Sequence, residues 1–134
     1  MQKKLKIKSE MENLRVVEKE LDDISSELGI AADNYGKIMV CAMEAVNNAI
    51  THGNKRDSKK YVVIEFRNKG EELRISVEDE GKGFKPSEIP DPTKPENVEN
   101  ITGRGVFLMS HLADKIEFSE NGNKVMMYFN DIRI

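Results

Sequence analysis

The alternation of hydrophobic and polar residues predicts short strands and two long helices. Leu5-Lys6-Ile7-Lys8 alternates with a period of two, which indicates a half-buried strand. Ser9 and Glu12 have the spacing of a capping box for the helix that follows. The apolar residues of that helix recur every three or four positions: Met11, Leu14, Val17, Leu21, Ile24 and Leu28. Gly29 is placed to end this helix, and a second helix is predicted over 33–52 with Gly53 as its C′ residue.

The second half of the chain reads as two hairpins with a helix between them. Strands are predicted at 61–67 and 72–78, and Asn68-Lys69-Gly70 is a hairpin signal between them. A short helix is expected at 105–113, followed by strands at 115–119 and 124–129. This order favours the α+β class, a two-layer α/β sandwich with helices on one face of a mixed, mainly antiparallel sheet. We expect the 134 residues to form a single domain.

Residues 85–102 interrupt this pattern and contain all four prolines of the chain. Prolines at that spacing exclude a long helix or a central strand. Loops of such length in a compact domain are generally functional lids or disordered segments, and we expect a lid over a pocket.

Composition narrows the function classes. A net charge of −3 gives no general attraction for nucleic acid or for an anionic membrane, and the basic stretches at 3–6 and 55–60 are expected to be solvated flanks. The single cysteine, Cys41, excludes an internal disulfide. No apolar run approaches the roughly 18 residues of a membrane span, and the first residues lack a secretory signal. We therefore expect a soluble, cytoplasmic protein.

Three polar residues share one face of the second predicted helix. Glu44, Asn48 and His52 follow one another at intervals of four residues. An Asn carbonyl suits Mg²⁺, a Glu one turn away suits a general base in phosphoryl transfer, and a His at the helix end could reach a phosphate. A solvated polar face is an equally good interpretation of the helix alone, and for His52 a helix-end preference is the better one.

Asp79 continues the apolar face of the preceding strand and stands where that strand ends. A carboxylate there needs a donor, and an adenine amino group is one. Gly81 and Gly83 would let the backbone approach a flat base, with Phe84 directly after them. The alternative is a glycine-rich turn in which the Asp bonds its own backbone.

The run Gly103-Arg104-Gly105 is predicted to open a helix, where free N–H groups and an arginine can bind phosphate. Ordinary loop glycines would explain the run equally well. The Walker pattern is absent, which excludes a P-loop enzyme.

In this order the three motifs resemble those of the histidine-kinase-like ATPase superfamily, and within it the stand-alone bacterial anti-sigma-factor serine/threonine-protein kinases. The resemblance rests on Glu44-Ala45-Val46-Asn47-Asn48, Asp79-Glu80-Gly81-Lys82-Gly83 and Gly103-Arg104-Gly105-Val106. It covers almost the whole chain, although the last run is shorter than the Gly-x-Gly-Leu-Gly of many relatives.

The resemblance implies ATP and Mg²⁺ as cofactors, Glu44 as the general base and Asn48 as the Mg²⁺ ligand. It also implies a nucleotide pocket lined by Asn48, His52, Asp79, Gly81, Gly83, Phe84, Thr102, Gly103, Arg104, Gly105 and Val106. The implied partners are an anti-sigma-factor antagonist with a Ser or Thr acceptor and a sigma factor, with the kinase as a possible homodimer. Two alternatives stay open: a nucleotide-regulated binding protein without catalysis, and a detached histidine-kinase catalytic domain.

Overall fold

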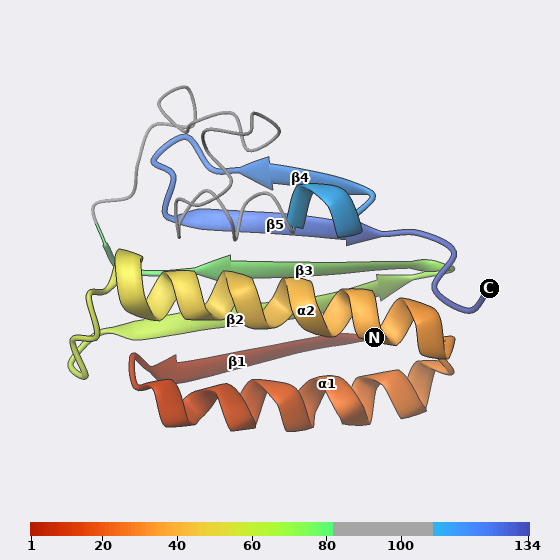
Figure 1. The fold of residues 1–134 in the computed structure, drawn as a ribbon, viewed down its shortest axis with the longest axis horizontal. Helices are drawn as coiled ribbons and strands as arrows, with labels where there is room; N and C mark the ends of the chain where they lie inside the picture. Colours follow the sequence, from red (N-terminus) through yellow and green to blue (C-terminus); the bar gives the residue numbers. More distant parts are fainter. Residues whose placement is uncertain (82–108) are drawn as a thin grey trace.

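The computed structural model describes residues 1–81 and 109–134, and these contain one five-stranded sheet. The strands lie in the order β1-β2-β3-β5-β4 (Figure 1). Their bounds are β1 Gln2–Lys8, β2 Tyr61–Lys69, β3 Glu72–Glu78, β4 Lys115–Phe118 and β5 Lys124–Phe129. All four pairings of these strands are antiparallel, so the described sheet lacks the parallel pair that a mixed sheet would contain.

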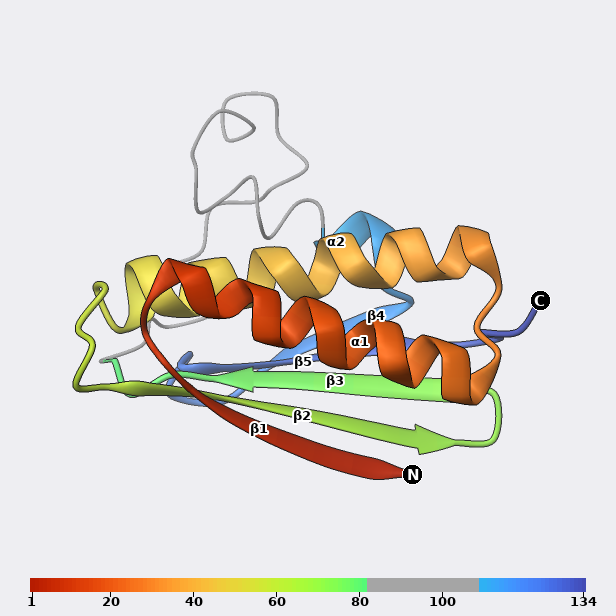
Figure 2. The same cartoon turned by 90° about the horizontal axis from the view of Figure 1, so that it is seen from below.

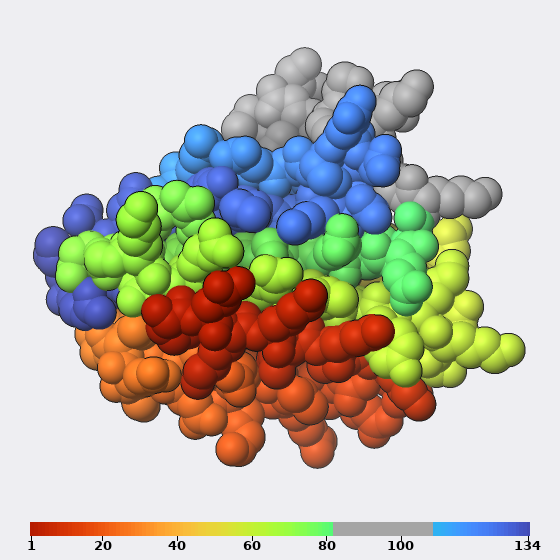
Figure 3. Space-filling model, turned by 180° about the vertical axis from the view of Figure 1, so that it is seen from behind, coloured from red at the N-terminus to blue at the C-terminus, as the bar shows by residue number. Residues whose placement is uncertain are grey.

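Two helices, α1 (Leu14–Leu28) and α2 (Ala32–Asn48), lie side by side on one face of this sheet (Figure 2). Their apolar stripes meet the inward side chains of the strands, and the fully buried residues include Leu21, Ile24, Ile38, Ile64 and Phe66. The opposite face of the sheet has no helix of the described residues over it (Figure 3). This arrangement is the two-layer α+β sandwich that the hydrophobic pattern predicts.

The predicted capping box at the start of the first helix is wrong. A 3-10 turn at Met11–Asn13 precedes α1, and neither it nor α1 has a side-chain N-cap. Ser9 is buried at the end of β1, where its hydroxyl donates to the Lys60 carbonyl at 2.8 Å. The hydroxyl thus joins the end of β1 to the start of β2. Gly29 does end α1 as predicted, with a left-handed φ of 69°.

The end of α2 also differs from expectation. The helix continues as one π-helical turn at Ala49–Gly53, and Gly53 does not adopt the left-handed conformation typical of a C′ residue. Two non-glycine residues adopt it instead, Lys55 with φ 53° and Arg56 with φ 59°. The Arg56 N–H donates to the Ile50 carbonyl at 2.7 Å and closes the helix end.

The two predicted hairpins are confirmed, with left-handed glycines at both turns, Gly70 (φ 60°) and Gly122 (φ 75°). Residues 109–112 are helical, as expected, whereas 105–108 and the predicted lid at 85–102 lie outside the described residues. No helix of the described part has the length and apolar character needed to span a membrane.

Candidate functional site

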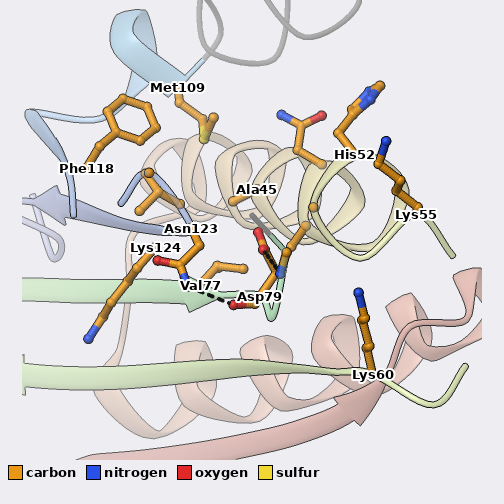
Figure 4. A pocket seen from close by; sticks show the side chains of 16 residues that line it. Ala45, His52, Lys55, Lys60, Val77, Asp79, Met109, Phe118, Asn123 and Lys124 are labelled. Atoms are coloured by element: carbon orange, nitrogen blue, oxygen red, sulfur yellow. Dashed lines mark hydrogen bonds between the residues drawn. The ribbon is translucent and has the colours of Figure 1, made fainter. Parts of the chain in front are cut away.

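A cavity of about 630 Å³ lies between the C-terminal half of α2 and the end of the sheet where β3 finishes and β5 begins (Figure 4). Its volume is in the range of small-molecule sites. The apolar part of its wall consists of Ala45, Ala49, Val77, Met109, Phe118 and Val125. A surface of this kind suits a flat, weakly polar group such as a nucleobase.

The charged groups around the cavity are mostly basic. Lys55, Lys60 and Lys124 line it together with a single carboxylate among the described residues, that of Asp79, and the exposed His52 is a further polar lining residue. The chain as a whole carries a net charge of −3, so positive charge is concentrated here against the overall balance. The site therefore favours an anionic ligand. The expectation that 55–60 is only a solvated flank is wrong, because Lys55 and Lys60 line the cavity.

Asp79 lies at the sheet end of this cavity, as the strand register predicts. Its Oδ1 accepts a hydrogen bond from the Gly81 N–H at 2.8 Å, so the local turn considered as an alternative does form. Its Oδ2 has no hydrogen-bond partner within residues 1–81 and 109–134, which leaves this oxygen able to accept from a ligand. Burial raises the pKa of the Asp79 carboxyl above its ordinary value, although the Gly81 N–H and, more weakly, the nearby Lys60 ammonium act in the opposite direction.

Two glycines make room for this carboxylate. A Cβ on Gly53 would lie 2.2 Å from Asp79 Oδ2, and a Cβ on Gly81 would lie 2.1 Å from the Gly53 carbonyl oxygen. Any side chain at either position would push the carboxylate or the backbone away. Gly53 is thus required by close approach rather than by helix termination, and the end of α2 is packed directly on Asp79.

The structure brings only part of the polar face of α2 to the cavity. Asn48 and His52 line it, whereas Glu44, one turn before Asn48, is half-buried and is not among the described lining residues. The Asn48 amide makes no hydrogen bond to the described part of the chain, so its oxygen is available as a metal ligand. His52 lies at the rim next to Lys55 (Figure 4).

Several predicted site residues cannot be placed. Residues outside the described ranges are Gly83, Phe84, Thr102, Gly103, Arg104, Gly105 and Val106. Their assignment to the nucleotide pocket therefore stays a prediction.

Sequence reasoning did not identify Asn123, which holds the Asp79 backbone from the turn directly before β5. Asp79 N donates to the Asn123 carbonyl at 2.9 Å, and Asn123 Nδ2 donates to the Asp79 carbonyl at 3.1 Å. Asn123 has the sequence signal of a turn residue in Glu120-Asn121-Gly122-Asn123, and nothing in that signal indicates a contact with Asp79. Lys60 was not identified as a cavity residue either, because it stands in a run of charged residues that is typical of a solvated segment.

A cavity of small-molecule size, with an aspartate at a strand end and a helix that carries an amide unpaired in the described part, suits a nucleotide ligand. Residues 7–129 match the family described as histidine kinase-like ATPase domain, and the chain belongs to that family.

Among curated proteins, the chain is similar to an anti-sigma F factor of Clostridium perfringens, with 34% identity over 109 residues covering 76% of each chain. It is also similar to the serine-protein kinase RsbW of Staphylococcus epidermidis, with 24% identity over 131 residues, 92% of this chain and 82% of the relative. A solved structure of the RsbU and RsbW domains of a Mycobacterium tuberculosis protein shares the fold. Its TM-score is 0.71 at 18% identity, over 97% of this chain and 32% of that longer one.

Proposed function

We propose that the protein is an ATP-binding serine/threonine-protein kinase of the anti-sigma-factor type. The observation that carries the nucleotide half of this proposal is the Asp79 carboxylate, with one oxygen unpaired in the described part, at the end of an apolar cavity with a basic rim. An adenine ring would lie against the apolar wall and donate its amino hydrogen to Asp79. The phosphates would extend toward the basic and polar rim.

The residues present would fit a magnesium ion that takes one oxygen ligand from the protein. Mg²⁺ usually takes one or two protein oxygens and leaves its other positions to phosphates and water. Asn48 offers one such oxygen at the cavity, and no cluster of three or more acidic, His or Cys ligands exists in the described residues. When bound, the ion would neutralise charge that develops on the phosphates.

The kinase half of the proposal assigns the proton transfer to Glu44. A Ser or Thr hydroxyl of the acceptor protein would attack the γ-phosphorus, Glu44 would take the hydroxyl proton, and ADP would leave. The anti-sigma F factor and the serine-protein kinase RsbW among the relatives support an anti-sigma-factor antagonist as acceptor and a sigma factor as the second partner. We include a homodimer in this proposal as the assembly that the family resemblance implies.

Calorimetric titration with ADP, with and without Mg²⁺, tests the nucleotide half. Saturable binding that is lost in Asp79→Ala is the expected result. No binding to the wild-type chain would overturn the proposal and leave an interaction domain.

Phosphotransfer tests the kinase half. Labelled ATP and an anti-sigma-factor antagonist domain should give a phosphoprotein with the wild type and none with Glu44→Ala, while both bind ADP. Release of the sigma factor on addition of ATP without any phosphoprotein would instead indicate a nucleotide-regulated binding protein.

A further inference from the structure

A single buried amide joins the end of α2 to the turn that carries Asp79. The amide belongs to Asn54, which follows Gly53 directly and is 0% exposed. Its Oδ1 accepts a hydrogen bond from the Glu80 N–H at 2.7 Å. Its Nδ2 donates to Ser9 Oγ at 2.7 Å and to the Tyr61 carbonyl at 2.9 Å. The side-chain carbonyl and amino group of Asn54 are thus both hydrogen-bonded, and their partners lie at or next to the ends of three strands, β1, β2 and β3.

The chemistry of the partners determines which way this amide points. The Glu80 N–H can only donate and the Tyr61 carbonyl can only accept, so a flipped amide would place like groups against each other. Ser9 Oγ gives its own hydrogen to the Lys60 carbonyl at 2.8 Å and is therefore an acceptor toward Asn54. The network consequently has one satisfied arrangement.

This arrangement links the immediate neighbours of the two residues that meet in the cavity. Asn54 follows Gly53, and Glu80 follows Asp79, while Gly53 packs against the Asp79 carboxylate. On the other side of the turn, Asn123 exchanges two hydrogen bonds with the Asp79 backbone. The turn is therefore held both from the end of α2 and from the start of β5, and Asn54 does this without lining the cavity itself.

We propose that Asn54 is a positioning residue for adenine recognition, and that its amide sets the location of the Asp79 carboxylate relative to the end of α2. The proposal rests on the proposed function, in which Asp79 accepts the adenine amino hydrogen. A hydrogen bond of this kind tolerates only a few tenths of an ångström in its length. Without the Asn54 amide, the strands would still pair, but the Asp79 carboxylate would lose its fixed position relative to the end of α2.

The test compares the affinities for ADP and for inosine diphosphate, which has an oxygen in place of the adenine amino group. The wild type should prefer ADP by roughly tenfold to a hundredfold, the factor that one hydrogen bond to a charged group supplies. In Asn54→Ala this ratio should fall toward one.

The matched control is Asn34→Ala, at the opposite end of α2. Asn34 Nδ2 donates to the carbonyls of Asp131, Ile132 and Ile134 at 3.0–3.1 Å, so it is also an amide that joins distant segments. Its loss should lower thermal stability and leave the ratio at the wild-type value. A folded Asn54→Ala protein with the wild-type ratio would overturn the inference alone. A wild type that binds both nucleotides equally would refute the proposed function and the inference with it.

A measurement on the wild type covers the case in which Asn54→Ala does not fold. The Glu80 amide should exchange with solvent deuterium as slowly as the paired amides of β3 in the nucleotide-free protein, because it donates a partly buried hydrogen bond to the buried Asn54 side chain. Exchange at the rate of an exposed loop would show that Asn54 does not hold the turn.

Discussion

Replacing Gly53 with alanine should remove adenine recognition while the fold survives. The new Cβ would stand 2.2 Å from Oδ2 and 2.3 Å from Cγ of Asp79, where ordinary contacts begin near 3.4 Å. The carboxylate must therefore move by roughly 1 Å or rotate out of the cavity. The backbone itself tolerates alanine, because Gly53 is not in the left-handed region.

The magnitude follows from the bond that is lost. A hydrogen bond to a charged group contributes about 1.5–3 kcal/mol, so the dissociation constant for ADP should rise roughly tenfold to a hundredfold. Rotation of the Asp79 side chain would also break its bond to the Gly81 N–H, which should lower the free energy of unfolding by about 1 kcal/mol. Binding should thus suffer more than stability.

Calorimetry with ADP and chemical denaturation measure the two effects, and Gly36→Ala is the matched control. Gly36 lies on α2, and among the described residues nothing beyond its chain neighbours and the surrounding helix backbone lies within 4 Å of the place where an alanine Cβ would stand, so alanine there should leave ADP binding unchanged. It should also stabilise the protein by up to about 1 kcal/mol through helix propensity. Wild-type ADP affinity in Gly53→Ala would refute the assignment of Asp79 as the adenine contact.

Three further outcomes are expected. Burial raises the pKa of the Asp79 carboxyl, so ADP affinity should fall as the pH decreases through that raised pKa. The folded state holds this proton more tightly than the unfolded state, so the free energy of unfolding should rise over the same pH interval. Titrations with ADP and denaturation series measure the two trends, and Asp79→Asn should remove both. Asn48→Ala should abolish the Mg²⁺ dependence of ADP binding but spare the preference for adenine, and an equal loss with and without Mg²⁺ in calorimetry would contradict the ligand role. Burial raises the pKa of the Cys41 thiol to about 12, so a thiol reagent at pH 8 should label the protein only on unfolding, and rapid labelling of the native protein would be the contrary result.

Most of the fold was predictable from the sequence because the signals involved are local. Period-two alternation and three-to-four spacing report which face of an element is buried, whatever that element packs on. Gly29 and Gly70 have φ values of 69° and 60°, which other residues rarely adopt, so their turns could be recognised without knowledge of their neighbours.

The site was predictable only in part. Register places Asp79 on the covered face of its strand and Asn48 on the polar face of its helix, and the structure brings both to the cavity. Glu44 shares the helical face but is not among the described lining residues, and helical spacing alone does not distinguish it from Asn48. The sequence of the basic run at 55–60 does not distinguish a solvated flank from a segment that lines a site. The loop conformation decides this, and it places Lys55 and Lys60 at the cavity.

The sequence alone determined the elements, their order and the residue types available for nucleotide chemistry. Tertiary structure decided the roles of Ser9, Gly53 and Asn54. Ser9 resembles a helix cap, Gly53 a helix terminator and Asn54 an ordinary loop residue, yet they join segments 26 to 51 residues apart in the chain. Local patterns report backbone preference and burial, whereas a contact between distant segments exists only once the sheet and helices have brought those segments together.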